Sequence, residues 1–357
     1  MRIDHTELKR NTERCNAELE LIIQEGKTSC LSVAVLKRDR IVYEFYHGDS
    51  SPIPGFAAPI SKGTMFNVGS VTKPITGAAL VKLIEMGRLK LNDSISRHIP
   101  EFRFPEVTIL HLLTHTAGFN TSDADHIEAP VSDEDVPHYL QRIYEISHLL
   151  HKPGEVCNYC SWGYCILMDV VQRVSGMPFE EFVRATLFEP LGMQDSVFSA
   201  DLLEGREYVL PWHQESGRFL EREAKTATIG DRGLFTTATD LLRFASVFLN
   251  GGVNPATNAK VFSSAAIACM LREIPDRRLN KTPVFWRKGE QDTYGCFSDL
   301  HSPSAVGHTG FSGCMLMIDP EFDIAAAILT NSLTWHADWN NYSRVCSLVM
   351  AMSGARE

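Results

Sequence analysis

Strand-like segments at the two ends of the chain constrain its fold more than any other feature. Near the N-terminus, LSVAVLKRDRIVYEFYHGD has two runs rich in β-branched residues that turn at residues 37–40, which predicts a β-hairpin. Near the C-terminus, GCMLMIDPEFDIAAAILTNS has two apolar runs around residues 319–323, which predicts a second hairpin. We therefore expect one sheet that is assembled from both ends of the chain.

Helical spacing dominates the region between the two hairpins. Apolar residues recur at this spacing in residues 107–118, 138–150 and 164–176, and further helices are predicted at residues 5–26, 70–86 and 337–352. The pattern predicts an α+β protein whose antiparallel sheet is flanked by helices. We expect a single domain with its sheet part at residues 1–90 and 205–357 and an inserted, mainly helical subdomain at about residues 91–204.

Charge and apolar content argue against several classes of partner. The formal net charge is −10, and no block of lysine and arginine interrupts it, which argues against a nucleic-acid surface. No apolar run approaches the roughly 20 residues that span a bilayer. The opening MRIDHTELKRNTERC lacks the apolar segment of a secretory signal, so we expect a cytoplasmic location if Met1 is the native start. The nine cysteines are scattered and odd in number, which favours reduced, buried thiols.

A serine and a lysine stand three residues apart in NVGSVTKPITGAAL. Ser70 is the only serine of the chain with a lysine at that spacing, here Lys73. On a helix this spacing places both side chains on one face, about one turn apart. A helix N-terminus offers unpaired N–H groups to an oxyanion, and burial favours the neutral form of an amine, which can accept a seryl proton. The alternative is an ordinary N-terminal serine followed by a solvated lysine.

Two later segments could complete such a site. In PGEVCNYCSWG, Tyr159 and Ser161 follow a Pro-Gly loop and precede a helix predicted to begin near Trp162. A tyrosine beside an ammonium can act as a base, although a half-buried packing residue is the simpler interpretation of either side chain. In GHTGFSG, glycines surround Thr309 on a predicted strand, which indicates close approach of a ligand or of another backbone, or a β-bulge.

In this order, the three segments resemble the serine β-lactamase and penicillin-binding protein superfamily. The chain looks most like the branch that holds class C β-lactamases, DD-carboxypeptidases, D-aminopeptidases and β-lactamase-like esterases. The likeness covers roughly residues 31–331 and includes LLTHTAGF, PLGMQDSVFS, GDRGLFTTATDLLRF and DIAAAILTNS. It implies the β-lactamase/transpeptidase-like fold and hydrolysis through an acyl-enzyme, without a metal or another cofactor.

The resemblance also implies roles for individual residues. Ser70 is similar to the acylated nucleophile, Lys73 to the lysine that assists it, and Tyr159 to the tyrosine that moves protons between nucleophile and leaving group. The implied oxyanion hole consists of the backbone N–H groups of Ser70 and Phe311.

Substrate-binding positions follow from the same resemblance, with two departures. Ser161 stands where many members have asparagine, and His308, Thr309 and Gly310 occupy a triad that often begins with lysine. Ser161 cannot offer both amide dipoles, and a mostly neutral His308 attracts a carboxylate less than lysine does. Both departures favour an esterase or peptidase of relaxed specificity over an efficient β-lactamase, although all three activities on small-molecule substrates stay open.

Other functions have weaker support. His111 and His115 stand four apart in HLLTH, but the glutamate of a zinc-protease helix is missing. Cys157 and Cys160 form a single CxxC around Tyr159, which is weak evidence for zinc or redox chemistry but could make Tyr159 sensitive to oxidation. No Gly-x-Ser-x-Gly elbow indicates an α/β-hydrolase. A non-catalytic binding or scaffold protein with this fold is the alternative from another class. Oligomeric state is not indicated.

Overall fold

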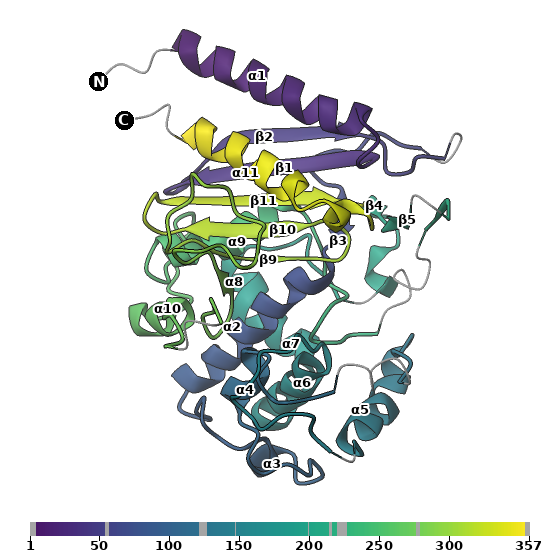
Figure 1. Cartoon of the computed structure of the whole chain (residues 1–357), viewed down its shortest axis with the longest axis vertical. Helices are drawn as coiled ribbons and strands as arrows, with labels where there is room; N and C mark the ends of the chain where they lie inside the picture. Colours follow the sequence, from purple (N-terminus) through teal and green to yellow (C-terminus); the bar gives the residue numbers. More distant parts are fainter. Residues whose placement is uncertain are drawn as a thin grey trace.

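The sheet predicted from the two chain ends is present in the structure. The computed structural model describes residues 5–53, 57–120, 127–146, 148–198, 200–213, 216–219, 227–275 and 279–353. Within them, an antiparallel sheet has the strand order β2-β1-β11-β10-β9-β8. Its strands are β1 (Cys30–Lys37), β2 (Arg40–Gly48), β8 (Trp286–Arg287), β9 (Val306–Thr309), β10 (Met315–Asp319) and β11 (Ile324–Thr330). The N-terminal strand β1 pairs directly with β11 from the C-terminal hairpin, as Figure 1 shows.

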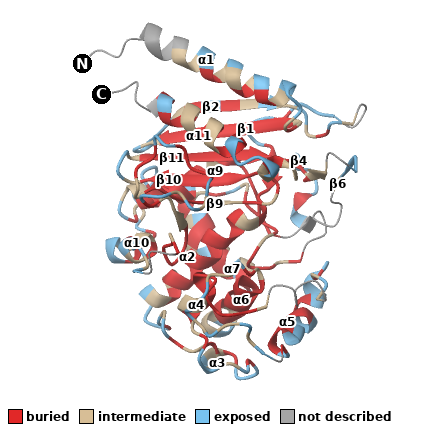
Figure 2. Cartoon of the chain, in the orientation of Figure 1, coloured by how far each residue is buried: buried red, intermediate tan, exposed pale blue. Residues whose placement is uncertain are grey.

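Helices cover both faces of this sheet. Along β1, Leu31, Val33 and Val35 pack against one pair of helices, α1 (His5–Gln24) and α11 (Asn340–Ser353). The alternate residues Ala34 and Leu36 point to the opposite face, which α9 (Ala238–Leu249) covers. A strand that is buried on both sides has no polar alternation, which explains the continuous apolar runs of β1 and β11 (Figure 2).

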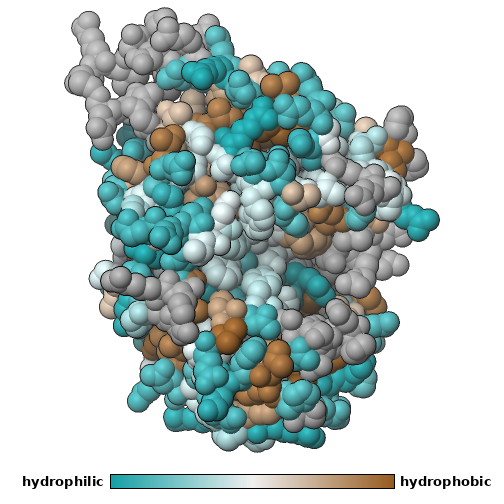
Figure 3. All heavy atoms as spheres, viewed as in Figure 1, coloured by the Kyte–Doolittle hydropathy of each residue, from teal (hydrophilic) through white to brown (hydrophobic). Residues whose placement is uncertain are grey.

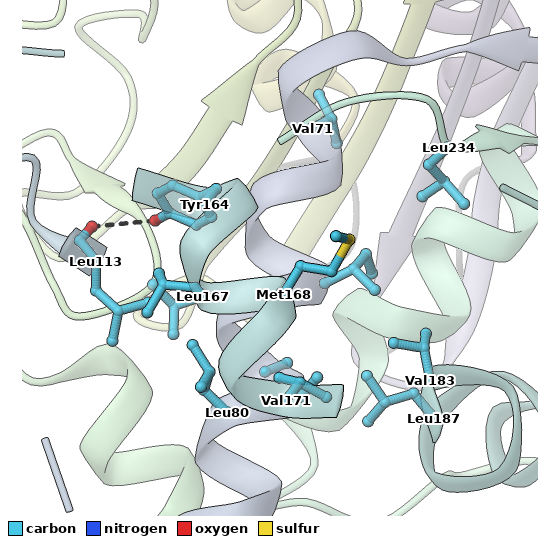
Figure 4. Close-up of a cluster of buried hydrophobic side chains, with 14 of the residues drawn as sticks. Val71, Leu80, Leu113, Tyr164, Leu167, Met168, Val171, Val183, Leu187 and Leu234 are labelled. Carbon is cyan, nitrogen blue, oxygen red and sulfur yellow. Dashed lines mark hydrogen bonds between the residues drawn. The ribbon is translucent and has the colours of Figure 1, made fainter. Parts of the chain in front are cut away.

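Helix α2 (Thr72–Glu85) joins the sheet to the helical region. Nearly every residue from Thr72 to Leu83 is buried, and α2 packs on α6 (Trp162–Ser175). Figure 4 shows Leu80 beside Leu167 and Val171 in this contact, with the Tyr164 hydroxyl donating to the Leu113 carbonyl at 3.0 Å. The start of α2 is therefore held between the two parts of the molecule.

Shorter elements complete the described chain. The helical region also contains α3 (Ile95–His98), α4 (Ile109–Leu113), α5 (Val136–Tyr144), α7 (Phe179–Val183) and α8 (Glu189–Leu191), and α10 (Ser264–Leu271) lies later in the chain. Two small sheets are formed by β3 (Met65–Asn67), β4 (Tyr208–Val209) and β7 (Phe235–Thr236), and by β5 (Trp212–His213) and β6 (Arg218–Phe219). None of the described helices is long and apolar enough to cross a bilayer. On the face in Figure 3, hydrophobic residues form small groups among hydrophilic ones.

Two predicted helices are much shorter in the structure. The helical pattern at residues 107–118 yields only α4, because the Thr114 hydroxyl donates back to the Leu110 carbonyl at 2.7 Å and His115 has a left-handed backbone with φ 58°. The pattern at residues 138–150 ends as a helix at Tyr144. Beyond it, the Leu150 and His151 N–H groups both donate to the Gly118 carbonyl, so this segment is tied to a loop instead of continuing the helix.

Candidate active site

A sharp turn places Ser70 at the start of α2. After β3, Gly69 adopts a positive φ of 51°, and a Cβ there would lie 2.4 Å from the Phe311 ring. The Asn67 side chain accepts the Gly69 N–H at 2.9 Å, and the Thr72 hydroxyl donates to the Gly69 carbonyl at 2.6 Å. Ser70 follows in a short 3₁₀ turn, Gly69–Val71, that leads into the helix. The predicted helix start is therefore confirmed, with the serine two residues ahead of the regular α-helix.

Lys73 is fully buried and reaches the serine. Its Nζ lies 3.0 Å from Ser70 Oγ, 2.9 Å from the Asp231 carbonyl oxygen and 3.4 Å from Ser161 Oγ. A lysine amine offers three positions for hydrogen bonds, and these three contacts use them. The carbonyl of Asp231 and the start of α6 thus hold the amine beside the Ser70 hydroxyl.

Tyr159 lies at the open side of the same group. The residue is 41% exposed, and its ring centre lies 5.0 Å from Lys73 Nζ and 6.3 Å from the His308 ring centre. The structure therefore brings together Ser70, Lys73, Tyr159 and Ser161 from two segments, α2 and the entry to α6. Their proposed roles stay proposals.

His115, to which the sequence analysis assigned no role in this site, supports the loop that carries Tyr159. Its carbonyl accepts the Asn158 N–H at 2.8 Å, and its Nδ1 accepts the Cys160 N–H at 3.3 Å. The imidazole lies 4.4 Å from the Tyr159 ring, centre to centre. These two bonds flank Tyr159 in the chain, so His115 fixes the loop on both sides of the tyrosine.

An aromatic stack, which we define as His115, Trp286 and Tyr294, continues behind Tyr159. Trp286 is nearly parallel to both of its neighbours, with ring centres 6.0 Å from His115 and 4.8 Å from Tyr294. The Nζ of Lys281 lies 3.9 Å from the centre of the Trp286 ring, and burial lowers the pKa of this lysine to about 7. Only long-range folding brings these residues together, so no local pattern could have indicated them.

Burial also keeps the two histidines of the site neutral. The pKa of His115 lies well below its usual value because of burial, and the nearby Lys281 and Lys73 lower it further. The pKa of His308 is lowered in the same way by burial and by the same two lysines. Since neither imidazole carries a charge at neutral pH, the strand residue His308 provides no cation.

The strand β9 and the turn after it pack directly against the nucleophile. A Cβ on Gly310 would lie 2.1 Å from the Val68 carbonyl oxygen and 3.5 Å from the Ser70 nitrogen, so only glycine permits this approach. The Ser312 hydroxyl donates to the Asn67 carbonyl at 2.9 Å and ties the turn to β3. The Phe311 N–H has no acceptor among the described residues. This packing brings Phe311 close to Ser70.

The residues considered for metal or redox chemistry have structural partners. His111 Nδ1 accepts the Thr108 N–H at 3.2 Å, whereas His115 bonds the loop of Tyr159. The described residues contain no group of three or more histidine, cysteine or acidic side chains that could hold a metal ion. Cys157 Sγ lies 3.6 Å from the Thr114 carbonyl oxygen, and burial raises the pKa of Cys160 to about 11.

Comparison with known proteins identifies the family. A family profile described as Beta-lactamase matches residues 10–345. The chain belongs to the beta-lactamase family. A protein of Salmonella agona (strain SL483) named "Putative D-alanyl-D-alanine carboxypeptidase" is 27% identical over 343 residues, which cover 84% of this chain and 78% of the relative.

Solved structures of two similar proteins show the same fold. One is EstCE1, described as a hydrolase with promiscuous acyltransferase activity, with a TM-score of 0.78 and 19% identity over 97% of this chain and 100% of that one. The other is a penicillin-binding protein homologue from Caulobacter crescentus, with a TM-score of 0.79 and 18% identity over 96% of this chain and 97% of that one. The predicted β-lactamase/transpeptidase-like fold is therefore confirmed, and the family and the relatives indicate a hydrolase.

Proposed function

We propose that the chain is a serine hydrolase that forms an acyl-enzyme on Ser70. The contact of 3.0 Å between Lys73 Nζ and Ser70 Oγ carries this proposal, because an amine at hydrogen-bond distance can receive the proton of an attacking hydroxyl. Tyr159 stands beside the same amine at the open side of the site. From there its hydroxyl can exchange protons with a leaving group.

The proposed reaction has two steps. Ser70 Oγ bonds to the acyl carbon and loses its proton to Lys73 and Tyr159. The bond to the leaving group then breaks, and the leaving group takes that proton. The tetrahedral oxyanion would accept hydrogen bonds from the N–H groups of Ser70 and Phe311. In the second step, water attacks the ester of Ser70, releases the acid and restores the hydroxyl.

Esters are the substrate class that the site favours. A neutral, buried His308 gives no positive charge to a substrate carboxylate, and Ser161 lacks the amide of asparagine that would pair with an acyl amide. The relative named as a carboxypeptidase supports the second candidate, a DD- or D-aminopeptidase. β-Lactam hydrolysis is the third.

A non-catalytic scaffold is the alternative from another class. It would have no reason to keep a buried lysine at hydrogen-bond distance from Ser70, since burying an amine is costly unless the amine is paired or used. The half-exposed Tyr159, which is supported on both sides by His115, argues in the same direction.

Intact-protein mass spectrometry with a fluorophosphonate and, separately, with a penicillin tests the proposal. We expect one fluorophosphonate adduct, located on Ser70 by peptide mapping and absent from Ser70→Ala. Ser96→Ala, which removes a serine hydroxyl of α3 that bonds the Phe102 carbonyl, is the matched control that should still be labelled. A penicillin adduct in addition would extend the substrate class to β-lactams, whereas no adduct with either reagent would favour the scaffold.

A further inference from the structure

The hydroxyl of Tyr294 engages both polar groups that Thr309 presents. It lies 2.6 Å from Thr309 Oγ1, and it accepts the Thr309 backbone N–H at 3.2 Å. These three groups have three hydrogens, and their two mutual bonds use two of them. The buried Tyr342 also hydrogen-bonds the Thr309 side chain. The trio therefore offers at most one O–H donor to a substrate, where Thr309 by itself would offer two donors.

This hydroxyl occupies the open edge of the sheet. The edge strand β8 covers β9 only at Val306 and Gly307, while the Gly310 N–H faces the other way and donates to the Cys314 carbonyl. Successive N–H groups of a strand alternate between its two sides, so the Thr309 N–H faces the uncovered edge. Tyr294 thus lies where an extended substrate would pair with this strand.

Packing fixes Tyr294 in that place. Its ring lies on Trp286, 4.8 Å between centres at 12°. The Asp292 carboxylate accepts the N–H groups of Tyr294, Gly295 and Phe297 at 3.1, 2.8 and 3.0 Å, which holds the surrounding turn. A hydroxyl on such a rigid support keeps its position when a substrate enters.

The blocked edge lies on the leaving-group side of Ser70. In the proposed function, the leaving group takes a proton that passes through Tyr159, so it must lie near that hydroxyl. Tyr159 packs on His115, with 4.4 Å between ring centres, and Trp286 connects His115 to Tyr294, so the Tyr159 side of the site continues to Tyr294 and Thr309. The acyl group then extends in the other direction, away from Thr309.

We infer that Tyr294 is a specificity-determining residue that disfavours leaving groups bearing a carboxylate. The inference rests on the proposed function and deepens it. A carboxylate has two oxygens that need charge-assisted donors when water is removed. Next to a neutral His308, the carboxylate of such a leaving group would find at most one donor at Thr309 and Tyr294. A leaving group that is an uncharged alcohol or phenol needs no charge-assisted donor. The natural substrates would accordingly be esters of uncharged alcohols, not peptides that release a free C-terminal amino acid.

The test compares two esters with the same acyl group, a phenyl ester and a 3-carboxyphenyl ester. They differ only by a carboxylate on the leaving group, so the ratio of their kcat/KM values isolates its recognition. Tyr294→Phe keeps the ring stack, frees the Thr309 N–H and removes the bond between the Tyr294 and Thr309 hydroxyls. We expect the ratio of carboxylated to plain ester to rise at least 10-fold, since a hydrogen bond to a charged group is worth about that much or more, while the plain ester changes less than about 3-fold.

Tyr46→Phe is the matched control, because its hydroxyl bonds Glu44 on β2, and it should leave both values unchanged. A ratio within twofold of the parent in Tyr294→Phe would overturn the inference and leave the proposed function standing. Failure of the parent chain to hydrolyse or be acylated by either ester would instead overturn the proposed function, and this inference with it.

Discussion

The amine of Lys73 lies over the face of the Tyr159 ring, 5.0 Å from its centre, while its hydrogen bonds lead to Ser70, Ser161 and the Asp231 carbonyl. The lysine therefore touches the nucleophile directly and the tyrosine through its π face. A positive charge at that place is attracted to the ring. The two residues would act as one proton-transfer unit, and substitutions should reveal this.

Tyr159→Phe should slow acylation of Ser70 by about 10²–10⁴-fold, because it removes a group that transfers protons in the transition state. The ring and its contact with His115 remain, so the melting temperature should stay close to that of the parent. Rapid-mix mass spectrometry of the acyl-enzyme, together with thermal unfolding, measures both. Tyr208→Phe changes a tyrosine of similar exposure, 39%, and should acylate normally. An unaltered rate in Tyr159→Phe would mean that Lys73 moves the proton by itself.

Gly310→Ala should disrupt the proposed oxyanion hole. The new Cβ would lie 2.1 Å from the Val68 carbonyl oxygen, so the turn that carries Phe311 must move away from Ser70. Loss of one oxyanion donor costs about 10²–10³-fold in turnover, and we expect a loss of this size in ester hydrolysis. Gly63→Ala, where the nearest atom would lie 3.8 Å away, should have no effect. Full activity in Gly310→Ala with an unchanged circular dichroism spectrum would contradict the assignment.

Lys281→Met should stabilise the protein most at low and neutral pH. Burial lowers the pKa of Lys281 to about 7 in the folded state, against about 10.4 for an unfolded lysine. Between these values the unfolded chain binds one proton more, so the parent gains stability as the pH rises, by roughly 5 kcal/mol over the whole window. Below pH 7 the folded parent carries the full cost of a buried ammonium.

Urea unfolding of parent and variant at pH 6, 8 and 10 tests this. The stability advantage of Lys281→Met should shrink steadily from pH 6 to pH 10. Lys288→Met removes the same charge from a partly buried lysine that donates to the His301 carbonyl, and its difference from the parent should not follow this pH trend. A constant difference for Lys281→Met across the three pH values would show that Lys281 does not titrate near neutrality.

Peroxide should lower the acylation rate through Cys157. Burial keeps Cys160 protonated, with a pKa of about 11, and a protonated thiol reacts slowly with oxidants. Cys157 is less buried and stands two residues before Tyr159, so its oxidation would displace the loop. We expect dithiothreitol to restore the rate and Cys157→Ser to protect it, while Cys269→Ser on α10 should not. Equal inactivation of Cys157→Ser would exclude this route.

Local patterns predicted the frame of the molecule well. The two hairpins and the beginning of α2 follow from strand runs, turn residues and helical spacing, and all of these are encoded within a few positions. The same kind of signal for α9 was overlooked, although Thr237 caps this helix by accepting the Asp240 N–H. The helix predicted at residues 107–118 is too long, because a hydroxyl bond and the left-handed backbone of His115 end it early. The spacing of apolar residues gives no information about either feature.

Only part of the site could be predicted from local sequence patterns. Ser70 lies in the 3₁₀ turn that leads into α2, and Lys73 lies in the first turn of α2, so their spacing implied contact. The support from His115 and the cap of Tyr294 on Thr309 arise from loops that meet only in the folded state. A histidine in a threonine-rich loop and a tyrosine before a predicted strand look like ordinary packing residues. What distinguishes them is their hydrogen-bond partners, and these are distant in sequence.

The pairing of β1 with β11 has a consequence for how the protein is made. During synthesis, β1 and the helix that carries Ser70 leave the ribosome long before the strand that must lie beside β1, and such distant pairing is slow to form. Until Gly310 and Phe311 reach the nucleophile, the growing chain holds a serine and a lysine without the second oxyanion donor. The proposed activity would therefore begin only when the last strands are in place, so an unfinished chain would not yet hydrolyse its substrate.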